Sequence, residues 1–318
     1  MPLGSLFIIR PEESVMTFSI VACDLEEHTW GVAVASKFPA VGAVVPWAQA
    51  DIGAVATQSF ANTSFGPRGL ALMGTGLSAQ ESLARLLEDD PDKELRQVGL
   101  VDARGGSATF TGGSCFGWAG GVSGKGYAIQ GNILASAKVV PAMEKTFKKA
   151  KGNLPTRLHA ALLAGDRAGG DKRGRQSAAI YVVKPKGGYG GFLDRWLDYR
   201  VDDHGDPVPR LGELLEMHDL YFGRGPESER VEIKGATLQQ ITDILTRENY
   251  LRKGKEFRSA FNEFIGNENF EERADPEAAW IDAPVLKYLV KKFNGVTASR
   301  SPAKQSPLDQ GLLSDGRE

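Results

Sequence analysis

The first two thirds of the chain carry short runs in which apolar and polar positions alternate, the pattern of β-strands in antiparallel sheets. Successive runs are separated by short turns rich in glycine, which predicts a meander at the start of the chain. The expected strands cover residues 17–23, 30–36, 41–47, 53–58, 97–102, 108–111, 127–130, 177–183 and 196–201.

Between these strands, apolar residues recur at helical spacing. Ser78 and Glu81 form a capping box at the start of one helix. The expected helices cover residues 67–73, 78–88, 139–150, 154–165 and 210–221. Strands, two helices, strands, two helices and strands again indicate an α+β domain whose helix pairs cover its sheets. A four-layer αββα sandwich fits this order, and other α+β layouts fit it as well.

The pattern changes after residue 222, so we expect a first domain over residues 17–222. Residues 223–232 are rich in Gly, Pro, Ser, Glu and Arg, which indicates a linker. Amphipathic helical patterns follow at 237–249, 255–265 and 283–293, with no strand between them, and predict a small all-helical domain over residues 233–295. The polar tail, 296–318, is expected to be disordered.

Composition narrows the possible functions. The chain has 318 residues, which suits one large domain and one smaller one, and a formal net charge of -2. We therefore expect neither nucleic acid nor a membrane surface as a partner. No apolar run approaches a membrane span, and the first residues lack the features of a signal peptide, so we expect a cytoplasmic protein. The two cysteines and four histidines have no metal-ligand spacing, so we expect no metal and no other cofactor.

The most informative position is Thr17, which directly follows Met16. If translation begins at Met16, methionine aminopeptidase exposes Thr17, and residues 1–16 are an N-terminal extension absent from the mature chain. An N-terminal threonine combines a nucleophilic hydroxyl with an α-amine whose ordinary pKa is about 8, so it can serve as its own base. The alternative is a threonine that begins a strand because of its β-propensity alone.

The segment TFSIVACDLEEHTWGVAVASKF resembles the opening of the catalytic subunit of plant-type asparaginases and isoaspartyl peptidases, and the proteasome β subunit begins similarly. These are N-terminal-nucleophile (Ntn) hydrolases. The resemblance implies that Thr17 is the nucleophile and that Ser36, at the end of the second strand, supports it. Lys37 is the third catalytic candidate of this segment, although in a regular strand it points to the opposite face.

A longer resemblance covers residues 17–221. It rests on VAVASKFPAVGAVVPWA, GAVATQ, RQVGLVD, QGN and AGGDKRGRQSAA, which resemble an uncharacterised bacterial family grouped with the Ntn hydrolases, domain of unknown function 1028. This resemblance implies a four-layer Ntn-hydrolase-like fold and an amidohydrolase that cleaves a small amide or an isopeptide-like bond. The alternative is a non-catalytic binding protein on the same scaffold.

The helical module, with LQQITDILTRENYLRKG, FRSAFNEFIGNENFEER and IDAPVLKYLV, resembles a domain named for peptidoglycan binding. Peptidoglycan fragments are therefore a second expected partner, beside a small-molecule amide substrate. The same module could instead serve as a docking or dimerisation surface, and we expect a homo-oligomer.

Several polar residues at strand ends and in loops are candidates for substrate binding. Gln58 and Asn62, in ATQSFAN, could donate hydrogen bonds to an oxyanion or a substrate, or could simply cap a loop. Gln130 and Asn132, in QGN, are expected to line the same cleft.

A glycine-rich loop, AGGDKRGRQSAA, supplies the remaining candidates, Asp171, Arg173 and Gln176. The guanidinium of Arg173 suits a carboxylate and the carboxylate of Asp171 suits an ammonium group. The alternative for this loop is a solvated turn with a local ion pair.

Overall fold

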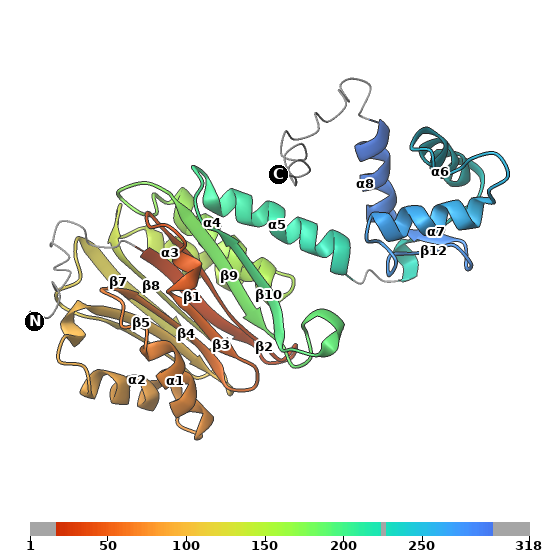
Figure 1. Cartoon of the computed structure of the whole chain (residues 1–318). Coiled ribbons are helices and arrows are strands. Elements are labelled where there is room, and N and C mark those ends of the chain that lie inside the picture. Colours follow the sequence, from red (N-terminus) through yellow and green to blue (C-terminus); the bar gives the residue numbers. More distant parts are fainter. Residues whose placement is uncertain (1–16, 224–226, 295–318) are drawn as a thin grey trace, which may run out of the picture. The chain divides into compact units, whose positions relative to one another are not determined.

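The computed structural model describes residues 17–223 and 227–294 (Figure 1). The chain divides into two compact units, and the division falls after Glu216. The first unit mixes strands and helices in the α+β order that the sequence predicts. Among the helices of the described ranges, none is long and apolar enough to cross a membrane.

The larger sheet of the first unit has six strands, all antiparallel to their neighbours. In spatial order these strands are β10 (Arg195–Val201), β9 (Ser177–Val183), β2 (Thr29–Ser36), β1 (Thr17–Asp24), β8 (Tyr127–Leu134) and β7 (Trp118–Gly124). The hairpin of β1 and β2 is the one that the sequence predicts, and its register sets Thr17 opposite Ser36. The opening strand therefore lies in the middle of the sheet, with β8 on its other side.

The smaller sheet has four antiparallel strands and packs face to face on the larger one. In spatial order its strands are β3 (Pro46–Gln49), β4 (Gly53–Ser59), β5 (Arg96–Asp102) and β6 (Ser107–Thr111). Apolar side chains such as Val34 from the larger sheet and Val101 from the smaller one form a buried cluster between them. Every second residue of these strands consequently faces the other sheet.

Helices cover the outer faces of both sheets (Figure 1). Their bounds are α1 (Phe65–Gly74), α2 (Ala79–Glu88), α3 (Val139–Lys149), α4 (Leu154–Arg167) and α5 (Pro207–Phe222). Leu86 of α2 packs with Leu100 of the smaller sheet, and Met143 of α3 packs with Phe18 of the larger one. The capping box predicted from Ser78 is present, because its side chain and that of Glu81 each bond the other's backbone N–H.

Two stretches of the first unit differ from the sequence prediction. Residues 41–47 are not one strand, because a 3₁₀ turn (Val41–Ala43) precedes β3, which begins only at Pro46. Proline has no N–H to donate to a ladder, so it fits the first position of an edge strand. The sequence does not predict β7, since three of its seven residues are glycines and no side-chain alternation marks it.

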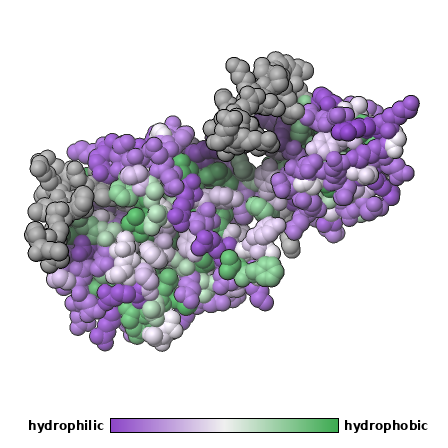
Figure 2. Space-filling model, in the orientation of Figure 1, coloured by the Kyte–Doolittle hydropathy of each residue, from purple (hydrophilic) through white to green (hydrophobic). Residues whose placement is uncertain are grey.

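After α5, the described residues of the second unit contain the α-helices α6 (Gly235–Arg247), α7 (Phe257–Asn267) and α8 (Ala283–Asn294). The prediction of an all-helical domain is wrong in one respect, because a three-stranded sheet accompanies them. Its strands are β11 (Arg230–Glu232), β13 (Trp280–Asp282) and β12 (Ala274–Asp275). They are too short to show an alternating pattern, and β11 lies in the segment expected to be a linker. The visible face of this unit is mostly hydrophilic (Figure 2).

A buried ion pair organises the second unit around the last turn of α5. Arg273 Nε donates to Asp282 Oδ2 at 2.5 Å, and both side chains are less than a tenth exposed. The Arg273 guanidinium also donates to the carbonyls of Asp219 and Leu220, at 2.7 and 3.0 Å. The end of α5 is therefore part of the fold of this unit.

Candidate functional site

Two rows of polar residues face each other where the strands of the two sheets come together. On the larger sheet, the pairing of Thr17 with Ser36 and Asn132, and of Ser36 with Ser177, makes a row across four strands. On the smaller sheet, Gln97 pairs with Gln58 and Thr111 in a second row. Polar residues thus occupy one end of the interface, whose apolar cluster includes Val34 and Val101.

Thr17 is completely buried, and its side chain and carbonyl are both held by this cluster. Its Oγ1 lies 3.2 Å from Ser36 Oγ, so one hydroxyl donates to the other. Gln58 Nε2 donates to the Thr17 carbonyl at 3.1 Å, and Asn132 Nδ2 donates to the same oxygen at 3.4 Å. The structure therefore brings together four of the residues that the sequence nominated.

Gln97, which was not among the candidates predicted from the sequence, makes the largest number of hydrogen bonds in the cluster. Its Nε2 donates to the carbonyl of Gly131 at 2.8 Å and to Thr111 Oγ1 at 2.9 Å. Its Oε1 accepts from Gln58 Nε2 at 2.7 Å and from Asn132 Nδ2 at 3.0 Å. Because a carbonyl oxygen only accepts, the Gly131 carbonyl fixes which end of the Gln97 amide faces it. The orientations of the Gln58 and Asn132 amides follow from that one atom.

A second set of hydrogen bonds lies deeper between the two sheets and continues from the Gln58 side chain. Ser19 donates its hydroxyl proton to Gln58 Oε1 at 2.6 Å and accepts from Gln130 Nε2 at 2.7 Å. Thr109 in turn donates to Gln130 Oε1 at 3.2 Å. A Cβ on Gly99 would lie 2.2 Å from that same Oε1, so only glycine at this position leaves room for the Gln130 side chain. Gln130, a predicted binding residue, is fully buried here and supports the cluster from beneath.

One polar atom of the cluster has no partner. Asn132 is 1% exposed, yet its Oδ1 accepts no hydrogen bond from any described residue. Its Nδ2 is committed to Thr17 and Gln97, so the amide cannot turn over to relieve this. A buried acceptor without a donor is uncommon in folded proteins and calls for an explanation.

The backbone is strained immediately after two of the amide residues. Ser59, next to Gln58, has φ of 70°, and Ile133, next to Asn132, has φ of 47°. A β-branched residue in the left-handed region is a clear outlier, because its side chain crowds the backbone there. The Ile133 N–H donates to the Phe116 carbonyl at 2.9 Å, which helps to hold this conformation. Strain of this kind clusters at functional sites.

The glycine-rich loop and the end of β2 form the rim beside this cluster. The side chain of Lys37 is exposed, while its backbone N–H donates to Asp171 Oδ2 at 2.7 Å. Asp171 Oδ1 accepts from the backbone N–H of Arg173 at 2.8 Å, and the two side chains form an ion pair. Gln176 Nε2 donates to Asp203 Oδ1 at 3.2 Å. These four residues thus lie beside Ser36, to whose carbonyl the Gln176 N–H donates at 3.2 Å. The Asp171 carboxylate is occupied by the N–H of Lys37 and by its own loop.

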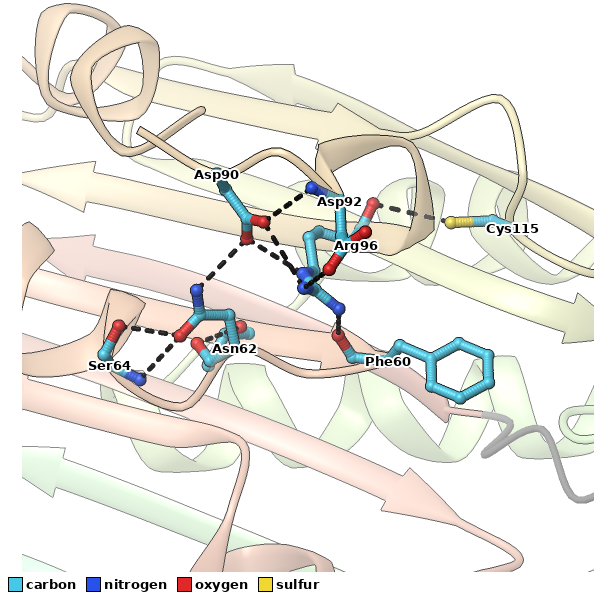
Figure 3. Close-up of polar contacts among 8 residues, drawn as sticks. Phe60, Asn62, Ser64, Asp90, Asp92, Arg96 and Cys115 are labelled. Atoms are coloured by element: carbon cyan, nitrogen blue, oxygen red, sulfur yellow. Dashed lines mark hydrogen bonds and ion pairs between the residues drawn. The ribbon is translucent and has the colours of Figure 1, made fainter. Parts of the chain in front are cut away.

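Asn62 belongs to a separate polar cluster at the start of β5 (Figure 3). Its Oδ1 accepts from the backbone N–H and hydroxyl of Ser64, and its Nδ2 donates to Asp90 Oδ2 at 3.1 Å. Arg96 Nε donates to the same carboxylate oxygen at 2.9 Å and to the Phe60 carbonyl through Nη1 at 2.7 Å. The Arg96 guanidinium lowers the pKa of Asp90 to about 2, with the Asn62 bond contributing. The side chain of Asn62 is therefore engaged in holding this loop.

The cluster around Thr17 contains hydroxyl and amide groups only, and neither kind titrates near neutral pH. Cys23 lies farther along β1, and its burial raises the pKa of its thiol to about 12, so it stays protonated. Among the described residues, no group of three or more His, Cys, Asp or Glu side chains could hold a metal ion. Any base that acts on the Thr17 hydroxyl must come from another group.

Sequence reasoning missed Ser19, Gln97, Thr109 and Thr111. The sequence signal for such residues is a polar side chain at a strand position that faces the other sheet. In RQVGLVD, Val98 and Leu100 face the helices, so Gln97 faces the other sheet. Which residue of the larger sheet it would meet depends on how the two sheets pack.

These features define an antiparallel two-sheet α+β protein with a buried hydroxyl–amide cluster at the start of its central strand. A model of the family of unknown function DUF1028 matches residues 17–211, and the chain belongs to this family. A second model, described as "Putative peptidoglycan binding domain", matches residues 221–289.

The chain is also similar to a crystal structure of protein SPO2555 from Silicibacter pomeroyi, whose title names the same DUF1028 family. The two are 27% identical, with a TM-score of 0.59, over 67% of this chain and 89% of that one. No protein with a curated description matches the chain.

Proposed function

We propose that the protein is an amide-bond hydrolase of the Ntn type, in which Thr17 is the first residue of the mature chain and the nucleophile. One observation carries the proposal: Thr17 begins a central strand with its Oγ1 3.2 Å from Ser36 Oγ and its carbonyl held by two side-chain amides. Two stacked antiparallel sheets with helices on their outer faces support the Ntn-hydrolase-like sandwich implied by the sequence resemblance.

The chemistry requires a base, and the α-amine of Thr17 supplies it once the Met16–Thr17 bond is cut. The Thr17 oxygen bonds to the carbonyl carbon of the substrate while its proton passes to the amine. The amine returns this proton to the leaving nitrogen as the carbon–nitrogen bond breaks, which leaves an ester on Thr17. Water, deprotonated by the same amine, hydrolyses the ester and restores the hydroxyl. The substrate is a small amide or an isopeptide-like bond.

The other candidate residues take different roles in this proposal. Ser36 orients the nucleophilic oxygen, and Gln58 and Asn132 hold the main chain of Thr17. The exposed ammonium of Lys37 has no part in the cluster, whereas its N–H anchors Asp171. Arg173, 35% exposed at the rim, is the group that would meet a carboxylate of the substrate.

The proposal is tested with two forms of the protein, expressed from genes that begin at the Met1 and Met16 codons. Methionine aminopeptidase removes Met16 in the second form, because the residue that follows is small, and intact-mass analysis identifies the chain that begins at Thr17. Both forms are incubated with a panel of small amides and isoaspartyl dipeptides. We expect hydrolysis only by the form that begins at Thr17.

Variants of that form complete the test. Thr17→Ala abolishes hydrolysis, and Thr17→Ser keeps part of it because a hydroxyl remains. Thr29→Ala is the matched control, since Thr29 is an equally buried threonine at the far end of the same hairpin. Equal activity of a form that retains residues 1–16, or of Thr17→Ala, would refute the proposal.

A second candidate function is a non-catalytic protein that binds peptidoglycan fragments. The complete burial of Thr17 and the family match of the second unit both favour it. Thermal-shift measurements on the full chain with soluble muropeptides test it, with mass spectrometry of the ligand afterwards. Stabilisation without consumption supports binding alone, whereas cleavage of the muropeptide, or no shift at any concentration, rejects this function.

A further inference from the structure

The unpartnered oxygen of Asn132 has a fixed direction. The Gly131 carbonyl forces Gln97 to present its Oε1 to Asn132, so Asn132 must present Nδ2 to Gln97 and keep Oδ1 free for a donor. Asn132 is 1% exposed, so bulk water does not supply that donor. The structure thus contains a preset acceptor directly beside the residue that pairs with it, Thr17.

The amide donors around this oxygen are already in use. Gln58 Nε2 donates to Thr17 and Gln97, and Gln97 Nε2 donates to Gly131 and Thr111. The hydroxyls of Thr17 and Ser36 bond each other, and this bond uses the proton of one of the two. The one donor that cleavage of the Met16–Thr17 bond would add is an α-amine, which has two or three hydrogens where the peptide nitrogen has one and which turns freely about its bond.

We infer that Asn132 is a positioning residue whose Oδ1 accepts a hydrogen bond from the free α-amine of Thr17 and holds that amine near its own hydroxyl. The inference rests on the proposed function, because it requires the mature chain to begin at Thr17. One side chain would then fix both ends of the residue: Nδ2 holds its carbonyl and Oδ1 holds its amine. The acceptor that is orphaned in the intact chain gains its partner on maturation.

The amine can be titrated without any substrate. The chain that begins at Thr17 is acetylated with a trace of acetic anhydride across a pH series, and mass spectrometry measures the labelled N-terminal peptide. Only the neutral amine reacts, so the midpoint of labelling reports its pKa. In Asn132→Asp a carboxylate replaces the amide, and we expect the midpoint to rise by at least about one pH unit, as for an ion pair at this range. In Asn132→Leu we expect it to fall, because an acceptor that favours the ammonium form is lost.

The charged groups around this strand end stay the same in every variant. They are Lys37 and the ion pairs Asp90–Arg96, Asp166–Arg175 and Asp171–Arg173. The matched control is Thr111→Val, a partly buried change in the same cluster that removes an acceptor of Gln97 and leaves Asn132 intact. We expect it to leave the midpoint within about 0.3 pH units of the parent chain, a small fraction of a direct charge effect.

Three outcomes overturn the inference: a midpoint unchanged in both Asn132 variants, equal shifts in Thr111→Val, or a fall in Asn132→Asp. If the variants fail to fold, a crystal structure of the parent chain that begins at Thr17 decides, since the inference requires the amine within hydrogen-bond distance of Asn132 Oδ1. Failure of the proposed function is a separate result: the labelling midpoint shifts as expected in the Asn132 variants, yet the chain that begins at Thr17 hydrolyses no amide.

Discussion

Gln97→Glu tests the direction of the hydrogen-bond cluster, because the change replaces one NH2 group by an oxygen and keeps the shape of the side chain. A neutral glutamic acid can donate its O–H to the Gly131 carbonyl, as Gln97 Nε2 does now at 2.8 Å. An ionised glutamate instead sets an oxygen against that carbonyl, at a site with no exposure to solvent. The fold therefore keeps this group protonated, and its pKa rises above the ordinary value of about 4.3.

The size of the effect follows from linkage. A group whose pKa is raised in the folded state contributes full stability below its unfolded pKa and loses it as the pH rises towards the folded pKa. Each pH unit above about 4.3 costs about 1.4 kcal/mol, which gives about 1 kcal/mol at about pH 5 and about 3.7 kcal/mol at about pH 7. Relative to the parent, the variant should thus lose about 2.7 kcal/mol of stability between the two.

Urea unfolding at both pH values, followed by tryptophan fluorescence, measures this loss, since four of the five tryptophans, at positions 30, 47, 118 and 196, lie in the first unit. The parent chain at each pH is subtracted. Gln80→Glu is the matched control, because Gln80 is exposed in the first turn of α2, where a negative charge is favourable. A penalty that is equal at both pH values, or that shrinks as the pH rises, would show that the Gln97 amide faces the other way.

Two further predictions concern the surroundings of the cluster. Gly99→Ala should destabilise the protein by about 2–4 kcal/mol, since its Cβ would lie 2.2 Å from Gln130 Oε1. In a double-mutant cycle read by urea unfolding, Gln130→Ala should then cost less in the Gly99→Ala background, and strict additivity would contradict the clash. Asp90→Asn should cost about 2 kcal/mol at neutral pH, because the pKa of Asp90 is lowered to about 2. The stability that the Asp90 carboxylate contributes is present above its ordinary pKa of about 3.9 and is lost as the pH falls towards 2. The difference in unfolding free energy between parent and variant should therefore shrink in acid, and a difference that stays constant with pH would contradict this prediction.

The association of Thr17 with Ser36 could be predicted from the sequence through the family resemblance, and the two residues lie opposite each other in the hairpin of β1 and β2. The role of Gln97 could not. Its partners on the larger sheet, Asn132 and the Gly131 carbonyl, lie more than thirty positions away, and only the packing of one sheet on the other brings them together. Local alternation shows that a residue faces inward, and it does not show what it faces.

The same limit explains the candidates that lie outside the cluster. Asn62 and Asp171 have residue types that suit a binding site, and each sits in a loop where side chain to backbone bonds compete for them. In the structure local bonds prevail, because Asn62 caps the turn at Ser64 and Asp171 accepts from the N–H of Arg173. Asp171 also accepts from the N–H of Lys37, at the end of β2. The sequence left these alternatives open because both readings require the same residue types.

The neutral character of the cluster bears directly on the proposed chemistry. An ordinary amine with a pKa of about 8 is mostly protonated at neutral pH and is then no base. Burial favours the uncharged form and lowers that pKa, and among the described residues the Thr17 site is buried among hydroxyls and amides whose bonds go to one another and to backbone carbonyls. A carboxylate in place of any of these amides would hold the amine as an ammonium ion. A neutral acceptor such as Asn132 Oδ1 can orient the amine without fixing it in the ammonium form. In the Asn132→Asp variant the amine should therefore hold its proton more tightly, and hydrolysis should be slower at pH values below the raised pKa of the amine.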